Sequence, residues 1–396
     1  MDILTILIIA VTLFAFPLGE FARVDFGNGI AFTFLDIGVA VIALFYIGRN
    51  MLSLRIAMTS FLRTVPKSLA VFLGVAGISL LLNLWWLSGF QRWVSFLYLV
   101  RFGLYASLLI ILKHDKNKKH QIFIRWSFFI AGGAILLVGF VQYFFYPSLA
   151  NLKYAGWDQH LYRLFSTFLD PNFTGAFLVL YFLFCGDWLL HVKKILEKFL
   201  LIVVEITTLL AIFLTYSRAA YLMLIVGTIS YLWLKGYKKW IVTTCIVGIL
   251  IGILVLGLVQ KKSEGTNLFR TVSTFARVGN AQNALTIFQR SPLIGIGFDS
   301  YRYMQRKYGF VVNDAGHGGA GADNSFLFVL ATTGIIGLVA YCGVWWSLLK
   351  RGLQKKSYFV VSSMLALFVG SLFNNLLFYP FLMYWIFLLI GITEST

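Results

Sequence analysis

Long runs of apolar residues, separated by short polar segments, extend over almost the whole chain. Each run is long enough, or nearly so, to span the ~30 Å hydrocarbon core of a bilayer as a helix. The pattern therefore predicts an all-α fold, a polytopic bundle of about twelve transmembrane helices. The runs cover residues 3–19, 30–47, 69–87, 93–112, 122–146, 173–190, 199–216, 219–235, 240–259, 326–348, 358–375 and 378–393.

The polar segments between these runs alternate in charge. Every second segment is rich in Lys and Arg, and such segments are retained on the cytoplasmic side of a membrane. The alternation predicts a multi-pass protein of the cytoplasmic (inner) membrane with both termini in the cytoplasm. Residues 1–4 lack the basic side chains of a signal peptide, so we interpret the first run as a retained helix. The basic clusters lie at Arg49, Arg55, Arg63, Lys67; Lys113, Lys116, Lys118, Lys119, Arg125; Lys193, Lys194, Lys198; Lys235, Lys238, Lys239; and Lys350, Arg351, Lys355, Lys356.

The composition supports the same class of protein. Hydrophobic residues make up 60% of the chain and charged residues 12%, with a mean hydropathy of +0.84. Residues 1–396 are therefore predicted to form a single membrane domain. The net charge of +18 would suggest nucleic acid in a soluble protein, but here many of the basic residues lie in the cytoplasmic loops, and no nucleic-acid partner is expected. The three cysteines lie in apolar runs and are interpreted as small apolar residues.

One segment between apolar runs is much longer than the others. Residues 260–325 are predicted to form a long extracytoplasmic loop between the ninth and tenth helices, and this loop is basic. Residues 278–290 favour a short amphipathic helix with apolar Val278 and Leu285 on one face, followed by a turn at residues 294–297. Asp299 is expected to cap a second short helix. The loop is interpreted either as a lid over a substrate or as a plain connector.

Three helix starts on the predicted outer face carry polar residues. Asp170, followed by Pro171, and Ser217 are both typical of N-terminal caps, and Asp323 is expected to cap the tenth helix, which would lower its pKa. Arg218 is anomalous because a cation in the first turn opposes the helix dipole. It requires either an anionic ligand or an extended conformation that reaches the lipid headgroups.

Phosphate is the anion that best fits these features. Arg218, together with Arg163, Arg277 or Arg290, could hold a diphosphate through bidentate hydrogen bonds. The outer segments contain no Asp-x-Asp or His-x-x-His spacing, and the outer histidines His160 and His317 are isolated. We therefore expect arginines, with no metal and no cofactor, to neutralise a phosphorylated substrate.

Four sequence motifs, in order, resemble a known family. Residues 215–221 resemble the Ser-Arg-(Gly/Ala) signature of the O-antigen ligase and O-antigen polymerase superfamily, and Arg163 with the segment 166–172 resembles its preceding outer loop. Arg277 followed by residues 292–297 is similar to its Arg-helix-Pro-x-x-Gly-x-Gly pattern. Asp323-Asn324, nine residues and then Gly334-x-x-Gly337 match the spacing of its His-(Asn/Ser/Gln)-x9-Gly-x-x-Gly motif.

The resemblance implies a metal-independent membrane glycosyltransferase of the GT-C type. Such enzymes act at the outer face of the cytoplasmic membrane, using an undecaprenyl-diphosphate-linked glycan as donor and a glycan or glycolipid as acceptor. By motif, Arg218 and Arg277 would stabilise the diphosphate. The motif's His would orient or activate the acceptor hydroxyl, but here that position is Asp323. Either Asp323 is the base, or His317 replaces the family's His, or the acceptor differs.

The predicted site therefore has two parts. The catalytic candidates are Asp323, His317, Arg218 and Arg277, and the candidates for binding substrate are Arg163, Arg290, Arg302, Asn172 and Asn324. Two other interpretations remain open: a transporter or flippase of lipid-linked glycans, with Asp36, Arg101, Asp187 and Glu205 along a polar path, and a non-catalytic membrane subunit. The sequence does not distinguish ligase from polymerase.

Overall fold

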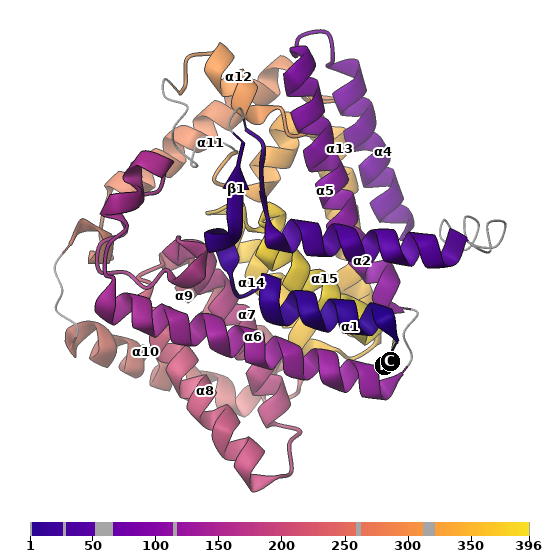
Figure 1. Ribbon diagram of the computed structural model, residues 1–396. Coiled ribbons are helices and arrows are strands. Elements are labelled where there is room, and N and C mark those ends of the chain that lie inside the picture. The colour runs from indigo at the N-terminus through magenta and orange to yellow at the C-terminus, as the bar shows by residue number, and fades with distance from the viewer. Residues whose placement is uncertain are drawn as a thin grey trace.

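The computed structural model is largely helical (Figure 1). It describes residues 2–26, 29–51, 66–113, 117–258, 263–311 and 321–395. Each of the twelve apolar runs coincides with a helix, and the last two runs are separate helices, since α15 begins at Pro380. These helices are α1 (Ile3–Ala10), α2 (Phe34–Met51), α4 (Lys67–Leu82), α5 (Gly89–Lys113), α6 (Lys118–Phe145), α7 (Pro171–Leu189), α8 (Ile195–Leu214), α9 (Arg218–Leu234), α10 (Ile241–Leu258), α13 (Ser325–Gln354), α14 (Tyr358–Gly370) and α15 (Pro380–Ser395).

Length and composition identify the helices suited to a membrane. Within the described ranges four helices are long and apolar enough to cross it, namely α5, α6, α7 and α13. Shorter apolar helices occur at 3–15, 67–82, 218–234, 358–370 and 380–393. These helices indicate a multi-pass membrane protein. That the chain crosses the membrane about twelve times stays a prediction.

The start of the second apolar run differs from the prediction. Strands β1 (Arg23–Asp25) and β2 (Ala31–Thr33) form a small antiparallel hairpin, and α2 begins only at Phe34. The Asp36 carboxylate accepts hydrogen bonds from the Thr33 amide at 2.7 Å and the Thr33 hydroxyl at 3.0 Å. These bonds fix the boundary between β2 and α2. Because of the hairpin, the expectation of a purely α fold was wrong in this segment.

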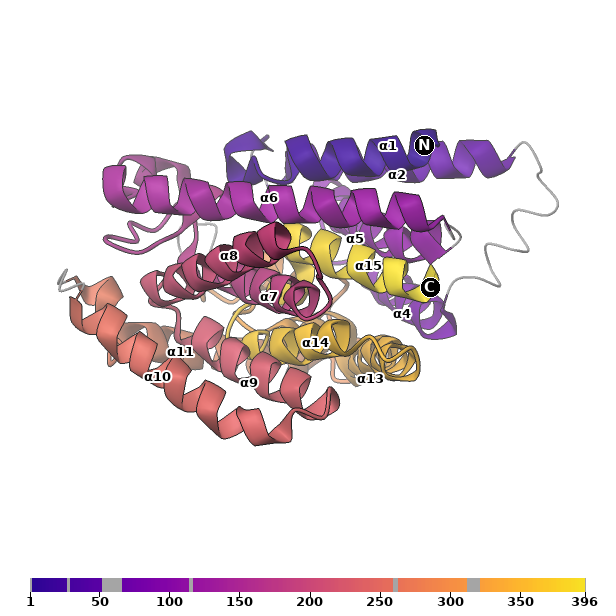
Figure 2. The same cartoon turned by 90° about the horizontal axis from the view of Figure 1, so that it is seen from below.

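The last helix lies at the centre of the bundle. Every residue from 380 to 391 on α15 is buried, and Trp385 packs against Phe16, Phe128 and Phe177 from three other segments. Figure 2 shows α15 between a layer containing α1, α2 and α6 and a layer containing α13, α14 and α9. The α7 helix, also mostly buried, completes this core and carries one of the polar helix starts.

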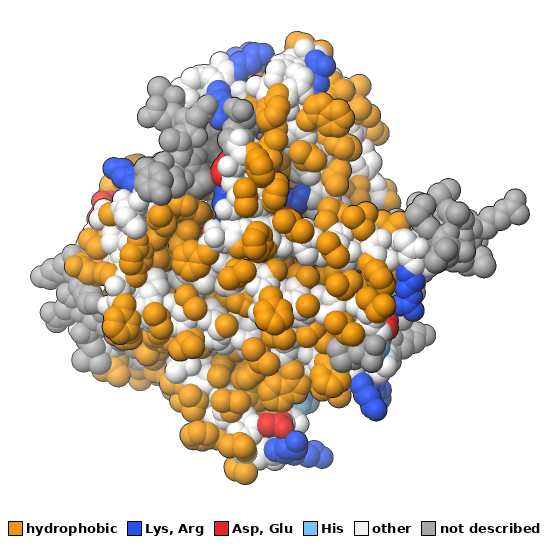
Figure 3. All heavy atoms as spheres, in the orientation of Figure 1, with side chains coloured by type: hydrophobic (Ala, Val, Ile, Leu, Met, Phe, Trp, Pro, Cys, Tyr) orange, Lys and Arg blue, Asp and Glu red, His pale blue; other side chains and the backbone are white. Residues whose placement is uncertain are grey.

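The outer surface of the bundle is strongly apolar. Figure 3 shows one face covered largely by hydrophobic side chains, with most Lys and Arg side chains near its edges. Large apolar side chains are exposed along α6, α8 and α10, as expected of a surface that faces lipid. Both termini lie at one end of the molecule (Figure 2), where Arg49 forms an ion pair with Asp2 at 3.1 Å.

The long loop contains the two short helices that the sequence predicts. They are α11 (Val272–Arg290) and α12 (Tyr301–Lys307), and α11 begins six residues earlier than expected. Its buried face is Ala284 and Ile287, whereas Val278 and Leu285 are exposed. The N-cap of α12 is Ser300, not Asp299 as predicted.

The turn after α11 interlocks with a break in α13. The backbone amides of Ile296 and Gly297 donate to the carbonyls of Ala331 at 3.2 Å and Thr332 at 3.0 Å. In return, the amide of Ile335 donates to the carbonyl of Pro292 at 2.9 Å. The two glycine motifs noted in the sequence, residues 292–297 and residues 334–337, therefore pack against each other. This pairing fixes the C-terminal end of α11 to a membrane helix.

Two glycines make the interlock possible. Gly334 has a φ of 68° inside α13, and a Cβ there would collide with the carbonyl of Leu293. Gly295 has a φ of 69°, and a Cβ there would collide with the backbone at Thr332. Because only glycine adopts this conformation at little cost and leaves space for the neighbouring chain, both positions require it.

Candidate active site

Two of the three polar helix starts are joined directly. Asp170 caps α7 by accepting from the amide of Asn172 at 2.6 Å, and Ser217 caps α9, as predicted. The Ser217 hydroxyl donates to the Asn172 side-chain oxygen at 3.0 Å. The positive ends of two helix dipoles therefore lie side by side. Asn172 serves this junction, while its role in binding substrate remains a prediction.

The third helix start is capped by a different residue from the one predicted. Asn324 caps α13 by accepting from the amides of Phe326 at 2.8 Å and Leu327 at 3.0 Å. Its side-chain nitrogen donates to the carbonyl of Leu372 at 3.2 Å. Since Asn324 takes the cap position, the carboxylate of Asp323 is free of that role. The prediction of Asp323 as the cap was wrong.

The environment of Asp323 also reverses the predicted direction of its pKa. Burial raises the pKa of this carboxyl to about 6, against the opposing effect of the Arg277 guanidinium. The negative charges of Asp170 and Asp158 raise it further. Asp323 is thus a stronger base than an ordinary carboxylate and still largely ionised at neutral pH.

Arg163 and Arg270 are buried arginines that hold backbone. Arg163 Nε donates to the carbonyl of Thr215 at 2.9 Å, and Arg270 Nη2 donates to the carbonyl of Tyr216 at 3.1 Å. Arg270 Nη1 also donates to the carbonyl of Gly265 at 2.9 Å. Both side chains therefore shape the turn that precedes Arg218 and hold it against the start of the long loop.

Arg218 faces the loop and does not extend into solvent. Its Nη2 donates to the hydroxyls of Ser273 at 2.9 Å and Thr274 at 3.1 Å, and its Nη1 makes longer bonds to the carbonyls of Leu268 and Arg270. These partners lie just before or within the first turn of α11. The interpretation of Arg218 as a side chain reaching for lipid headgroups is therefore disfavoured, because its direct partners are neutral oxygens of the protein.

Arg277 has the most donor capacity left for a ligand. One contact is described for its guanidinium, a long bond of 3.4 Å from Nη2 to the side-chain oxygen of Asn374. Arginine carries five N–H donors in a planar fork, which suits the oxygens of a phosphate. Arg277 faces Asp323 electrostatically, because the nearby carboxylate counteracts the lowering of its pKa by burial.

The four arginines described above, Arg163, Arg218, Arg270 and Arg277, form a cluster whose members repel one another. Burial, followed by the charge of Arg270, lowers the pKa of Arg163 to about 9, and burial together with Arg218 and Arg277 lowers the pKa of Arg270. Among the described residues, none of the four forms an ion pair with Asp or Glu. Asp170, Glu264 and Asp323 are close enough to offset this charge in part, but none is in ion-pair contact, so the cluster keeps positive charge that suits an anion.

The segment beside the arginines has a strained backbone. His160, Tyr162, Ser166, Leu169 and Tyr216 have positive φ angles between 45° and 58°. Such conformations cost about 1–3 kcal/mol each and persist when the surroundings enforce them. Gln142 on α6 holds Ser166 in this way, because its side-chain oxygen accepts from the amides of Phe165 at 2.8 Å and Ser166 at 3.2 Å.

Two predicted site residues lie outside this cluster. Arg290, at the other end of α11, lies thirteen positions after Arg277, or about 20 Å along the helix, and stacks over Tyr308. Arg302 donates to the carbonyl of Gly29 in the hairpin at 3.3 Å and lies over Tyr98. The structure therefore does not bring these two arginines to the cluster. His317 lies outside the described residues.

Sequence reasoning missed one arginine of the cluster and three residues beside it. Arg270 lies seven positions before Arg277, just before the start of α11. Asn280 accepts a bond from the amide of Asp323 at 3.1 Å, and Asn374 contacts Arg277. His160 Nε2 lies 3.9 Å from Asp170, and burial lowers the His160 pKa. Asn280 and Asn374 carry no local signal, because their contacts are to distant segments.

The described donors of the site suit anions. In the described ranges, no group of three or more His, Cys, Asp or Glu side chains is placed to hold a metal ion. The cluster instead offers guanidinium groups, the amide of Asn172 and two helix N-termini. This arrangement can bind a phosphorylated group and place it near a carboxylate of raised pKa.

The fold and the candidate site together describe a multi-pass membrane protein with a cluster of arginines beside a carboxylate of raised pKa. Comparisons with known proteins agree with this class. Residues 203–342 match the family model described as O-antigen ligase. The chain is also 23% identical over 333 residues to the teichuronic acid biosynthesis protein TuaE of Bacillus subtilis (strain 168), covering 78% of this chain and 67% of TuaE. These matches support assignment to the O-antigen ligase and polymerase superfamily, as the motifs predicted.

Proposed function

We propose that this protein transfers a glycan from a polyprenyl-diphosphate carrier, of the undecaprenyl type, to a sugar hydroxyl. The observation that carries the proposal is the cluster of Arg163, Arg218, Arg270 and Arg277, which has no described carboxylate partner in ion-pair contact. A diphosphate supplies the missing charge. The family match suggests a glycosyltransferase of the ligase or polymerase kind, and the similarity to TuaE, a teichuronic acid biosynthesis protein, is consistent with a role in polysaccharide biosynthesis.

The arginines divide the work of binding the donor. Arg277 and Arg218 contact the diphosphate, since Arg277 is the least engaged and Arg218 is held only by neutral oxygens. Arg163 and Arg270 act as positioning residues that fix the turn at Tyr216 and add positive potential. Negative charge increases on the diphosphate as its bond to the sugar breaks, so preorganised guanidinium groups stabilise the transition state more than the bound donor.

Asp323 activates the acceptor in this mechanism. The acceptor hydroxyl oxygen attacks the anomeric carbon from the side opposite the diphosphate, and its proton passes to the Asp323 carboxylate. The bond between the anomeric carbon and the diphosphate oxygen breaks, and the diphosphate leaves as an anion held by the arginines. A pKa of about 6 makes this carboxylate a competent base at neutral pH. The reaction inverts the anomeric configuration and requires no metal or cofactor.

The proposed site faces the outer side of the cytoplasmic membrane. The alternation of basic segments supports this orientation, with both termini in the cytoplasm and residues 260–325 as an extracytoplasmic loop. In this arrangement the part of the loop from Ser273 to Gly297 lies beside the site, because Arg218 contacts Ser273 while the interlock with α13 fixes the turn at residues 292–297.

Purified protein tests the reaction directly. It is incubated with a polyprenyl-diphosphate oligosaccharide alone, and then with a second glycan or glycolipid acceptor. Extension of the glycan without the second acceptor identifies a polymerase, and product formed only with it identifies a ligase. Activity that disappears in EDTA and returns with a divalent metal would contradict the metal-independent mechanism. A complete lack of product would reject the enzyme in favour of the non-catalytic subunit.

The flippase alternative receives less support from the structure. Three of the four intramembrane charges expected to line a polar path are paired locally in two groups, whereas Glu205 Oε1 is buried with no hydrogen-bond partner among the described residues. Asp36 pairs with Arg101 between α2 and α5, whereas Asp187 accepts from Tyr231 on α9 at 2.8 Å and lies 3.7 Å from Lys235. Movement of lipid-linked glycan across proteoliposomes, without any new glycosidic bond, would favour the flippase.

A further inference from the structure

The segment 299–305, which contains most of α12, holds several buried polar groups without partners. Five of its side-chain atoms are buried and have no hydrogen-bond partner among the described residues. They are Asp299 Oδ2, the hydroxyls of Tyr301 and Tyr303, Arg302 Nε and Gln305 Nε2. A buried polar atom left without a partner costs about 1–3 kcal/mol. Such a cost, concentrated in one short segment, indicates a place that is prepared for a ligand.

These polar atoms lie on two sides of α12. Successive residues of a helix turn by about 100°, so Tyr301 and Tyr303 point in nearly opposite directions. Tyr301 lies on the side of the candidate base, since burial raises the pKa of its hydroxyl and the negative charge of nearby Asp323 raises it further. Tyr303 lies on the other side, together with Asp299 and Arg302. There, burial raises the pKa of Tyr303 to about 12, against the effect of Arg302 and with that of Asp299.

Asp299, Arg302 and Tyr303, with Tyr98 of α5, form what we term the α12 cluster. The guanidinium of Arg302 lies over the ring of Tyr98, 5.4 Å from its centroid. Both side chains donate to the carbonyl of Gly29 in the hairpin turn, Arg302 at 3.3 Å and Tyr98 at 3.1 Å. Figure 1 shows α12 above this hairpin, at the edge of the molecule. Because Arg302 and Tyr98 are only partly buried, the α12 cluster lies close beneath the surface.

The chemistry of the α12 cluster suits a sugar better than a phosphate. Its unpartnered groups are a carboxylate oxygen that accepts hydrogen bonds, a guanidinium N–H that donates them and a phenol that can do both. Sugar hydroxyls donate and accept, so they can satisfy all three groups, whereas the carboxylate of Asp299 would repel a phosphate. The φ of 56° at Asp299 is also strained, and strain of this kind is common where a fold holds a ligand.

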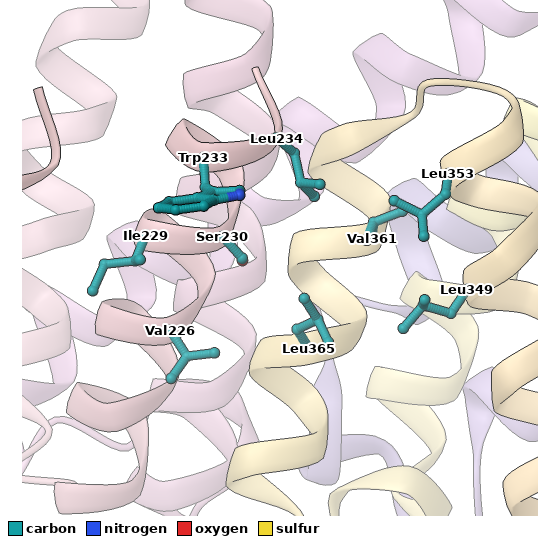
Figure 4. Close-up of a pocket in the computed structure, with 9 residues that line it drawn as sticks. All are labelled: Val226, Ile229, Ser230, Trp233, Leu234, Leu349, Leu353, Val361 and Leu365. Atoms are coloured by element: carbon teal, nitrogen blue, oxygen red, sulfur yellow. The ribbon is translucent and has the colours of Figure 1, made fainter. Parts of the chain in front are cut away.

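An apolar groove elsewhere in the molecule has the opposite character. It lies between α9, α13 and α14 and has a volume of about 400 Å³. Figure 4 shows its lining, which includes Val226, Trp233, Leu353 and Leu365. The hydroxyl of Ser230 in this lining already donates to the carbonyl of Gly227 at 3.0 Å. The groove therefore does not match the hydroxyls of a sugar, and the α12 cluster is the better place for a glycan.

We propose that the α12 cluster is a distal subsite for the acceptor glycan, separate from the place where the acceptor hydroxyl reacts. The subsite rests on the proposed function, because its ligand is the acceptor of that reaction. The reacting sugar lies beside Asp323 and Tyr301, and a later sugar of the same glycan binds Asp299, Arg302 and Tyr303. A helix with its side chains is about 10–12 Å across, so an oligosaccharide reaches both sides of α12 and a single sugar does not. The enzyme thereby prefers an oligosaccharide acceptor.

Acceptor length tests this subsite. An acceptor that supports transfer is prepared as a single sugar and as a trisaccharide, and KM is measured for each at saturating donor. Tyr303→Phe removes a hydroxyl that has no partner among the described residues, so the variant should stay folded. We expect KM for the trisaccharide to rise about five- to tenfold, the value of one hydrogen bond, and KM for the single sugar to stay unchanged. Asp299→Asn is a second variant with the same expectation.

Tyr341→Phe is the matched control. Tyr341 on α13 is also fully buried, and its hydroxyl likewise has no hydrogen-bond partner among the described residues. Its ring packs against Phe72, with the centroids 4.8 Å apart, so it belongs to the core of the bundle. Tyr341→Phe should change KM for neither acceptor. A rise in KM for both acceptors alike in Tyr303→Phe, or for neither, would overturn the subsite, while product from the single sugar would still support the transfer reaction.

A labelling experiment measures binding without turnover. The trisaccharide carries a photoreactive group at the end away from the reacting hydroxyl, and it is added to the purified protein without donor. It should label residues 299–307, and Tyr303→Phe should reduce the labelling. Labelling that Tyr303→Phe leaves unchanged, or stronger labelling of this segment by a photoreactive phosphatidylglycerol, would reject a glycan subsite. A lack of product from both acceptors would reject the proposed function, and labelling would still show whether the α12 cluster binds glycan.

Discussion

Two groups of charged residues in this protein, one around Arg101 and one beside the start of α9, are built in opposite ways. Arg101 on α5 forms a two-point ion pair with Asp36 on α2, with both N···O distances 2.7 Å, and the Tyr105 hydroxyl also donates to Asp36 at 2.8 Å. The arginines beside α9 have neutral oxygens as their described partners. In the first group the charge of Arg101 is neutralised by Asp36, whereas the second group keeps positive charge that no ion pair neutralises.

This difference teaches how to recognise a binding site among charged residues in a membrane protein. A structural cation within the bundle receives a carboxylate from the chain itself, as Arg101 does. A cation intended for a substrate must be left without one, because a permanent partner would compete with the ligand. Arg290 and Arg302 also lack a described ion pair, so it is the gathering of several such arginines at one place that marks the candidate site.

The largest effect is expected from breaking the complete pair. Arg101→Met leaves Asp36 as an uncompensated buried charge and should lower the free energy of unfolding by about 3–5 kcal/mol. Arg277→Met removes one long hydrogen bond and should lower the free energy of unfolding by at most about 1 kcal/mol. Thermal unfolding in detergent measures both. The double variant Asp36→Leu, Arg101→Met should recover much of the loss, and failure to do so would show that the pair is not what Arg101→Met disrupts.

The next largest effect is expected on catalysis. Arg277→Ala and Arg218→Ala should each reduce glycan transfer by about 10²–10³-fold, the loss seen when a charge-stabilising donor is removed from a transition state. Lysine at either position should restore part of the activity, because it keeps the charge without the planar fork. Arg290→Ala on the same helix is the matched control. An equal loss in that variant would mean that α11 tolerates no change, rather than that Arg277 binds substrate.

Loss of the Asp323 carboxylate, which faces the arginines, should change the rate of glycan transfer by about a hundredfold. Asp323→Asn removes the base and should reduce transfer by that factor. In the native protein kcat/KM should fall as the pH drops through about 6, because only the ionised carboxylate accepts a proton. Asp323→His, which restores the residue of the family motif, should keep more activity than Asp323→Asn. Full activity in Asp323→Asn would move the base role to another residue.

The smallest effect concerns the interlock rather than either arginine group. Gly334→Ala should destabilise the protein by about 1–3 kcal/mol, because alanine is strained at a φ of 68° and collides with Leu293. Gly343→Ala on the same helix has open space around the added methyl group and should be neutral or slightly stabilising. Similar unfolding temperatures for the two variants would contradict the role of Gly334.

Much of the helical fold was predictable because it depends on local properties. Apolar runs give the positions of the twelve helices, and Asp170-Pro171 and Ser217 show where α7 and α9 begin. The boundary at α13 was not predictable. Asp323 and Asn324 are adjacent residues that both favour caps, and contacts with Asn280 and Leu372 from distant segments accompany the choice.

The candidate site was predictable in its centre and not at its edges. Arg218 and Arg277 stand in motifs, and the structure brings them together. Arg290 and Arg302 have the same chemistry in the same loop, but the fold directs Arg290 over Tyr308 and Arg302 toward the hairpin. In the sequence, the basic residues of a loop look alike, because tertiary contacts decide where each side chain points. Composition alone could therefore not tell which arginines belong to the cluster.

The interlock between the turn at residues 292–297 and the break in α13 constrains how this protein can be recombined with its relatives. Ser79 on α4 donates to the carbonyls of Ile294 at 2.6 Å and Thr332 at 2.9 Å, so three segments meet at one joint. A loop transplanted from a relative would arrive without its matching break and would leave open backbone groups in the bundle. Functional chimeras should therefore exchange α4, the loop and α13 as one cassette.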